Sequence, residues 1–343
     1  METMDVREYL RPQMDQVEAF IQASLVSDIS LLDATNRQLR ENPGKMLRPV
    51  LTLLCAGALG QVNEDSIRYA AATELLHNST LLHDDVVDGA TERRGQPTVA
   101  LLLGGTAAVL VGDFWLTKCM DAILGASIES NRVLHIFART LGSLAEGELL
   151  QMQKARRGDT GQEEYVRIIY CKTASLFETS AMSGALSVRA TEGQVRAVGE
   201  FARLLGIAFQ IKDDIFDYTD SEKTIGKPVG IDLLEQKITQ PLLCALDCVP
   251  EPEADAVREK VVKISDNPAL APEVRAFVLE HDGVRKAEEK MLQYISDAIA
   301  CLEILPETPE KNYLKEMARF VGKRNYCWKY MAIRSSRAPF PRW

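Results

Sequence analysis

Residues 75–88 read Leu75-Leu76-His77-Asn78-Ser79-Thr80-Leu81-Leu82-His83-Asp84-Asp85-Val86-Val87-Asp88, an apolar run that ends in three aspartates within five residues. A second stretch repeats the pattern downstream as Phe209-Gln210-Ile211-Lys212-Asp213-Asp214-Ile215-Phe216-Asp217. In a helix, aspartates four residues apart share one face, where unpaired carboxylates repel each other. One such cluster can be solvated surface, but two clusters that follow apolar runs are hard to explain in that way. The pattern therefore predicts a positive partner at both clusters.

Magnesium is the partner that fits these carboxylates best. Carboxylate oxygens are preferred Mg²⁺ ligands, and protein-bound Mg²⁺ is commonly shared with phosphate groups. A calcium loop is not expected, because no glycine occupies the required turn and the aspartate spacing is helical. We therefore expect the two clusters to meet around a phosphate-bearing ligand with bound Mg²⁺, for which Mn²⁺ is an alternative ion.

Apolar residues recur with a helical period over most of the chain, and no β-alternation of useful length is found. Helices are expected at about residues 66–88, 100–124, 131–155, 162–182 and 194–218, and helical patterns continue to about residue 321 with breaks at prolines. No linker or internal repeat is evident. The sequence predicts one large all-α domain over residues 1–324. A basic C-terminal tail at 325–343 follows, either disordered or foreign to the protein.

The bulk composition excludes several classes of protein. The 343 residues are 46% hydrophobic with a net charge of −9, which supports a sizeable core and argues against nucleic-acid binding. The seven cysteines are scattered and no signal peptide is recognisable, so we expect reduced thiols and a cytoplasmic protein. Glycines and Asp113 interrupt the longest apolar stretch, residues 99–116, so no membrane span is expected.

Several basic residues, beside helix breaks or on helices expected to face the clusters, are candidate phosphate ligands: Lys45, Arg48, Arg93, Arg94, Lys172, Lys212, Lys227 and Lys237. Arginine matches phosphate oxygens with a planar fork, and lysine acts as a point charge. No Gly-x-x-x-x-Gly-Lys-Ser/Thr loop is present, which disfavours a nucleotide hydrolase of that type. No Ser/His/Asp arrangement stands out either, so a protein nucleophile is not expected.

In order along the chain, the motifs resemble those of the trans-polyprenyl diphosphate synthases. They are Gly44-Lys45-x-x-Arg48-Pro49, Asp84-Asp85-x-x-Asp88, Arg93-Arg94-Gly95, Gly112-Asp113, Lys172-Thr173, Gln210-x-x-Asp213-Asp214-x-x-Asp217 and Gly226-Lys227-Pro228. The resemblance covers about residues 15–324. It implies an isoprenoid synthase type I fold, a single helical bundle around a central cavity. It also implies Mg²⁺-dependent head-to-tail condensation of isopentenyl diphosphate with an allylic diphosphate.

The resemblance further implies a role for each motif residue. Metal ions that bridge the allylic diphosphate would be bound by Asp84, Asp88 and Asp213, with Asp85, Asp214 and Asp217 in support through water. That diphosphate would be clamped by Arg93, Lys172, Gln210, Lys227 and Lys237, with a hydroxyl from Thr173. Isopentenyl diphosphate would be bound by Lys45, Arg48, His77 and Arg94. Gln236 departs from the family pattern, in which a glycine is common before the lysine at position 237.

Product length is expected to depend on Ser79 and Thr80, one turn before Asp84. Family members with bulky aromatic residues at these two positions resemble the short-chain enzymes. Two small residues therefore predict a medium-to-long all-trans product, whose floor would come from elsewhere. Candidates for the floor are Trp115, Leu116 and Met120.

Three alternatives stay open: a short-chain farnesyl or geranylgeranyl diphosphate synthase, a terpene cyclase, and a non-catalytic synthase subunit. The resemblance suggests a homodimer, for which the small-residue helix around Gly104 to Gly112 is a candidate interface. A peripheral membrane contact for product release is a further expectation. Lys323-Arg324 resembles the basic end of some short-chain members, but the tail beyond it does not fit.

Overall fold

The computed structural model describes residues 6–40, 44–93, 95–219 and 230–324, and it confirms the all-α prediction. The helices are α1 (Val6–Tyr9), α2 (Arg11–Ser24), α3 (Ser30–Arg40), α4 (Leu47–Leu59), α5 (Glu64–Val87), α6 (Val99–Leu103), α7 (Gly105–Leu124), α8 (Ser130–Arg157), α9 (Gln162–Ile169), α10 (Ser175–Ser187), α11 (Glu192–Thr219), α13 (Ile231–Leu234), α14 (Gln240–Leu246), α15 (Glu251–Lys263), α16 (Leu270–Glu280), α17 (Gly283–Cys301) and α18 (Pro309–Lys323). Arg94, Lys227 and the tail at 325–343 lie outside the described residues.

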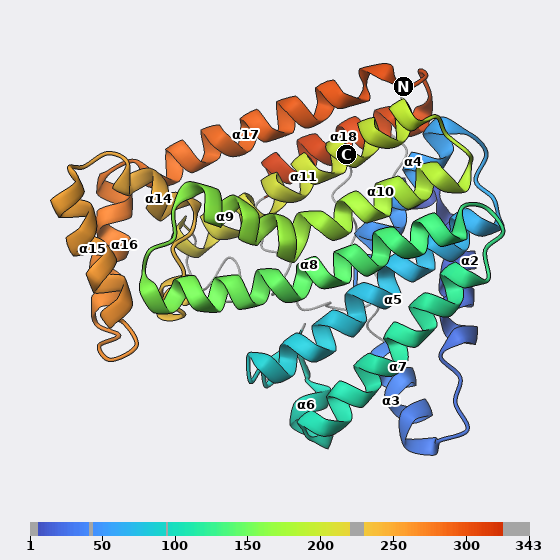
Figure 1. Ribbon diagram of the computed structural model, residues 1–343, viewed down its shortest axis with the longest axis horizontal. Coiled ribbons are helices and arrows are strands. Elements are labelled where there is room, and N and C mark those ends of the chain that lie inside the picture. The colour runs from blue at the N-terminus through green and yellow to red at the C-terminus, as the bar shows by residue number, and fades with distance from the viewer. Residues whose placement is uncertain (1–5, 41–43, 94, 220–229, 325–343) are drawn as a thin grey trace.

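Helix α5 is the centre of the bundle and contacts α2, α4, α7 and α10 (Figure 1). It begins at Glu64 because the Asn63 side chain accepts the Ser66 N–H at 3.0 Å, while the Ser66 hydroxyl accepts the Asn63 N–H at 3.2 Å. This reciprocal cap satisfies two amides of the first turn. The helix ends at Val87, one residue before Asp88. The first aspartate cluster of the sequence therefore lies at the C-terminal end of α5, as predicted.

Two predicted helices are interrupted. The helix expected over 100–124 breaks at Gly104, whose φ of +86° separates α6 from α7. The helix expected over 162–182 extends to Ser187 and contains one π-helical turn, η1 (Tyr170–Ala174). Both interruptions depend on local backbone geometry that apolar periodicity does not report.

A minimal hairpin of β1 (Glu92–Arg93) and β2 (Gln96–Pro97) follows α5, and in it Arg93 pairs with Gln96. Helices α14 to α17 follow the long helix α11, and α15 and α16 stand at one end of the molecule (Figure 1). A short 3-10 turn, η2 (Leu302–Ile304), leads to α18. None of the helices in the described ranges is both long and apolar enough to cross a membrane.

Candidate active site

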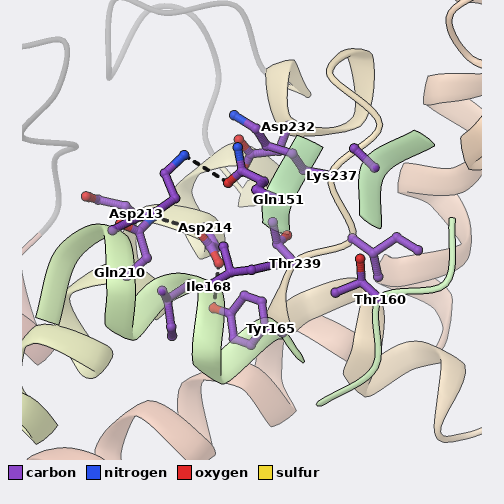
Figure 2. Close-up of a pocket in the computed structure, with 14 residues that line it drawn as sticks. Gln151, Thr160, Tyr165, Ile168, Gln210, Asp213, Asp214, Asp232, Lys237 and Thr239 are labelled. Atoms are coloured by element: carbon purple, nitrogen blue, oxygen red, sulfur yellow. Dashed lines mark hydrogen bonds between the residues drawn. The ribbon is translucent and has the colours of Figure 1, made fainter. Parts of the chain in front are cut away.

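A central cavity of about 270 Å³ brings together most of the predicted site residues from elements far apart in the sequence. The predicted residues that line it are Lys45, Arg48, His77, Asp84, Asp88, Arg93, Lys172, Thr173, Gln210, Asp213 and Lys237. A neighbouring cavity of about 180 Å³ adds Asp214 (Figure 2). Both aspartate clusters therefore contribute to one connected region, with basic side chains between them.

In the first cluster, Asp84 and Asp88 face the central cavity and Asp85 does not. Asp85 is only 4% exposed and accepts a hydrogen bond from Arg93 Nε at 2.6 Å, on the side of α5 that faces a third cavity. Burial, and then the negative charges of Glu148 and Asp88, raise the pKa of Asp84 to about 6. Asp85 therefore fixes the position of Arg93. The charged form of Asp84 would be stabilised by a positive charge bound nearby.

In the second cluster only Asp213 faces the central cavity, and its Oδ1 pairs with Arg324 Nη1 at 2.8 Å. Asp214 accepts hydrogen bonds from the Tyr165 hydroxyl at 2.6 Å and from Gln210 Nε2 at 2.9 Å (Figure 2). Burial, followed by the nearby Asp232 charge, raises the pKa of Asp214 well above its usual value.

Asp217, the third carboxylate of the second cluster, caps another helix. It accepts the backbone N–H groups of Ile231 and Asp232 at 3.2 and 2.9 Å, at the start of α13. A carboxylate at a helix N-terminus satisfies amides that have no partner within the helix. Asp217 therefore connects the second aspartate cluster to the segment that carries Lys237.

The π-helical turn η1 presents Lys172 and Thr173 to the cavity. Two glycines let neighbouring helices approach it closely: a Cβ at Gly147 would lie 2.6 Å from Cys171 Cβ, and one at Gly206 would lie 2.5 Å from Ala174 Cα. Isolated π-turns of this kind are frequent at functional sites. The predicted pair Lys172-Thr173 therefore rests on a backbone feature that only glycines on α8 and α11 permit.

Each side chain of this pair is held by a neighbour. Lys172 Nζ lies 2.6 Å from Glu148 Oε1 and donates to Gln151 at 3.0 Å, and burial lowers the pKa of Lys172 despite Glu148. The Thr173 hydroxyl donates to Gln210 Oε1 at 2.9 Å. Because Gln210 also donates to Asp214, one hydrogen-bond chain joins the π-turn to the second aspartate cluster.

Lys45, Arg48 and His77 also line the central cavity. Burial, together with the positive charges of Arg7 and Arg324, lowers the pKa of Lys45 to about 8. Arg7 also donates to the Lys45 carbonyl at 3.1 Å. Crowded cations of this kind favour an anionic ligand, which relieves their mutual repulsion.

Gln236 occupies a left-handed conformation, with φ +57°, which explains why a glycine is common there. Its N–H donates to Leu233 O at 2.9 Å, and the Lys237 N–H donates to Asp232 O at 2.8 Å. These two bonds form a Schellman motif that ends α13, with Gln236 as the left-handed residue. The Gln236 side chain donates to Ser265 Oγ at 3.2 Å and to the Val262 carbonyl.

Despite this departure from the family, Lys237 reaches both the central and the neighbouring cavity. Burial alone would lower the pKa of Lys237, but the carboxylates of Glu235, Asp232 and Asp88 outweigh it and raise the pKa. The lysine thus stays positively charged beside the first aspartate cluster.

Ser79 and Thr80, the predicted length determinants, differ in their surroundings. Ser79 is 1% exposed and donates to the Gly112 carbonyl of α7 at 2.9 Å, whereas Thr80 is partly exposed and donates to the His77 carbonyl at 2.8 Å. Among the floor candidates, Trp115 is buried and donates to Asn36 Oδ1 at 2.9 Å, and Met120 is 39% exposed. Ser79 is thus committed to helix packing, and Thr80 has more freedom to vary.

The carboxylates fit divalent cations that are shared with a phosphate ligand. Within the described residues no group of three or more His, Cys, Asp or Glu side chains is gathered closely enough to hold an ion alone. Asp84 and Asp88, at the end of α5, and Asp213, on α11, instead line one cavity together with lysines and arginines. Mg²⁺ is usually bound by one or two carboxylates together with phosphate oxygens and water.

Some site residues were not predicted from the sequence. Glu148, Tyr165 and Asp232 hold Lys172, Asp214 and Lys237, and Arg324 pairs with Asp213. Only Arg324 gave a signal, as part of the basic pair that ends the helical pattern. The others are single polar residues in helices or loops, and only the tertiary fold reveals their partners.

A helical bundle whose central cavity gathers carboxylates of both aspartate clusters and several basic side chains suits an enzyme class that binds phosphate-bearing ligands. A family model described as polyprenyl synthetase matches residues 29–275. The octaprenyl diphosphate synthase of Haemophilus influenzae is 36% identical over 322 residues, which cover 94% of this chain and 97% of that protein.

Solved structures agree. A decaprenyl diphosphate synthase from Rhodobacter capsulatus has a TM-score of 0.85 and 33% identity, over 93% of this chain and 98% of that one. A geranylgeranyl pyrophosphate synthetase from Pyrococcus horikoshii has a TM-score of 0.85 and 29% identity, over 93% and 98%. The chain belongs to the polyprenyl synthetase family and is a trans-prenyltransferase, which confirms the resemblance.

Proposed function

We propose that this chain condenses isopentenyl diphosphate head-to-tail with an allylic diphosphate to give a medium-to-long all-trans polyprenyl diphosphate. The observation that supports this most directly is the single cavity lined by Asp84 and Asp88 from α5, by Asp213 from α11 and by basic side chains around them. The octaprenyl and decaprenyl synthases among its relatives support the longer product class.

The allylic diphosphate would bind between the two aspartate clusters. Arg93, Lys172 and Lys237 place positive charge around it, and Gln210 and Thr173 offer hydrogen bonds. Lys227 is proposed with them, although it lies outside the described residues. Bound Mg²⁺, or Mn²⁺, would supply further positive charge to the departing diphosphate. Fixed cations aimed at the leaving group lower the barrier to ionisation of the carbon–oxygen bond.

Isopentenyl diphosphate would bind at Lys45, Arg48 and His77. Arg94, also outside the described residues, is proposed with them. The double bond of isopentenyl diphosphate then attacks the allylic cation, and a proton is lost to the released diphosphate. This chemistry needs no protein nucleophile, so the side chains act by binding, orientation and charge.

Product length would be set beside Thr80 more readily than beside Ser79. A bulky side chain at Ser79 would have to displace α7, because Ser79 is buried against the Gly112 carbonyl. A phenylalanine at the partly exposed Thr80 can be accommodated with less change. We expect Thr80→Phe to shorten the product, which mass spectrometry of the hydrolysed prenols would detect; an unchanged length would exclude Thr80.

A homodimer through α6, α7 and α8 is part of the proposal. These helices carry a set of exposed large apolar side chains: Leu101, Leu102, Leu103, Val109, Leu110, Met120, Leu124, Leu149 and Met152. Such a patch is more extensive than the isolated apolar residues of an ordinary surface. It includes the region from Gly104 to Gly112 predicted from the sequence. Light scattering of the wild type and of Leu110→Glu, whose wild-type side chain is 63% exposed, tests the interface.

The central experiment uses the purified chain alone, with Mg²⁺, labelled isopentenyl diphosphate and geranyl or farnesyl diphosphate. Extension to a long all-trans product supports the proposal, and Asp84→Asn is the inactive control. A product that stops at farnesyl or geranylgeranyl diphosphate would favour the short-chain alternative. No turnover by the sole chain would favour a subunit that needs a partner.

A further inference from the structure

Arg324, which follows the last residue of α18, carries a positive charge in complete burial. Its side chain is 0% exposed, and its N–H donates to the Phe320 carbonyl at 2.9 Å. Buried arginines are uncommon unless their charge is paired. The surroundings of this guanidinium therefore indicate what it does.

Helix α11 supplies a carboxylate, a carbonyl and two aromatic rings to the Arg324 guanidinium. Nη1 lies 2.8 Å from Asp213 Oδ1, and Nη2 donates to the Phe209 carbonyl at 2.8 Å. The guanidinium carbon lies 4.2 Å from the centre of the Phe209 ring and 5.4 Å from that of Phe216. Charge-assisted hydrogen bonds and aromatic faces thus fix this cation beside the cavity.

This ion pair uses the carboxylate that a metal ion would need. Among the three aspartates of the second cluster, Asp213 is the one that lines the central cavity. A unit positive charge within a few ångströms of a carboxylate weakens the binding of a second cation there, and burial strengthens this effect. The metal must therefore share Asp213 with the guanidinium or displace it.

We propose that Arg324 is an internal counter-ion of Asp213 that makes metal binding at the second aspartate cluster conditional on a diphosphate group. The inference rests on the proposed function, because it takes Asp213 as a metal ligand. A diphosphate brings negative oxygens that offset the guanidinium charge, and it also supplies the ligands that the protein side chains lack. Arg324 is in this sense a positioning residue.

The coupling has a measurable form. If diphosphate raises the affinity for the metal by some factor, the metal raises the affinity for diphosphate by the same factor. Arg324 increases this factor by weakening metal binding only while diphosphate is absent. Removal of its charge should therefore tighten metal binding to the free protein and reduce the effect of diphosphate.

The test compares Arg324→Gln with Lys323→Gln, a matched loss of one charge at the exposed neighbouring position. Electron paramagnetic resonance gives the affinity for Mn²⁺ without substrate and with inorganic diphosphate, after correction for Mn²⁺ bound by free diphosphate. We expect Arg324→Gln to bind Mn²⁺ about 5-fold more tightly in the absence of diphosphate, at the lower end of ordinary coupling factors. Lys323→Gln should match the wild type, and Arg324→Lys should retain the coupling.

Unchanged or weaker Mn²⁺ binding by Arg324→Gln would overturn the proposal, because a purely structural arginine predicts one of those results. Arg324→Met, which keeps an unbranched stem over Phe209, replaces the glutamine variant if that variant does not fold. Failure of both to fold would also overturn it in favour of a folding role. Asp213→Asn separates the two proposals: if Mn²⁺ affinity with diphosphate is unaffected, Asp213 is no metal ligand and the proposed metal site itself fails.

Discussion

The two aspartate clusters share one sequence pattern but lie in different surroundings. The second cluster is enclosed in α11, and each of its carboxylates has a fixed protein partner: Arg324 for Asp213, Tyr165 and Gln210 for Asp214, and two backbone amides for Asp217. The first cluster lies at the end of α5, where Asp85 pairs with Arg93 and Asp88 is exposed.

The difference shows that one motif can serve two physical purposes. In the first cluster, burial and like charges raise the pKa of Asp84, so an incoming cation gains much from binding there. In the second cluster, the same residue types mainly organise Gln210, Thr173 and the start of α13. The first cluster therefore presents two carboxylates to the central cavity, whereas the second presents one and holds the other two in fixed hydrogen bonds.

The largest effect should come from Asp84 and Asp85, which are adjacent on α5 but line different cavities. Under the proposed function, Asp84→Asn should lower kcat by about 10³-fold, because it removes a carboxylate that would bind the metal ions of the departing diphosphate. Asp85→Asn should act mainly through Arg93 and raise KM for the allylic substrate by about 10-fold. Steady-state kinetics with each substrate varied in turn would measure both. Equal losses of kcat in the two variants would contradict separate roles for the two carboxylates.

A smaller effect is expected from the support of the second cluster. Tyr165→Phe removes the hydroxyl that donates to the buried Asp214, and should lower the free energy of unfolding by about 1–3 kcal/mol. Tyr170→Phe is the matched control, because its hydroxyl donates to the less buried Glu178 at 2.9 Å. Urea unfolding would measure both variants. Equal destabilisation by the two would show that Asp214 gains nothing special from Tyr165.

The fold and much of the site were predictable from the sequence because they depend on local patterns. Helical periodicity indicated the bundle, and the spacing of Asp84 and Asp88 placed them on one face before the fold was known. The partners of the second cluster were not predictable in this way. Tyr165 meets Asp214 and Arg324 meets Asp213 only after α9, α11 and α18 have packed.

Backbone geometry was the other feature that the sequence concealed. The π-turn at Lys172-Thr173 and the left-handed Gln236 follow from close packing and helix termination, which side-chain periodicity does not report. The resemblance to the family nevertheless pointed to Lys172, Thr173 and Lys237 as site residues, although it did not reveal the backbone geometry that positions them.

The raised pKa of Asp84 gives a stability effect with a definite pH dependence. An aspartate titrates near 3.8 in the unfolded chain and at about 6 in the folded one, so the folded state holds the proton more tightly. For this group, stability is highest below about pH 4 and falls as the pH rises to about 6. Asp84→Asn should therefore stabilise the metal-free protein by about 1–2 kcal/mol at pH 7.5 and have little effect at pH 4. Thermal unfolding at both pH values measures it, and stabilisation that does not depend on pH would contradict this origin.

The smallest effect concerns Gln236, at the end of the segment that Asp217 caps. Gln236→Gly relieves the left-handed strain, but it gives the unfolded chain more freedom and removes the side-chain hydrogen bonds to Val262 and Ser265. These terms are each about 1 kcal/mol and oppose one another, so we expect a net loss of stability below about 1 kcal/mol. Gln236→Asn, which tolerates the same backbone but is one methylene shorter, should lose the hydrogen bonds without gaining the freedom of glycine. If the asparagine variant matches the wild type in denaturant unfolding and in KM for the allylic substrate, the side chain does not anchor Lys237. The Schellman backbone alone would then position the lysine opposite the first aspartate cluster.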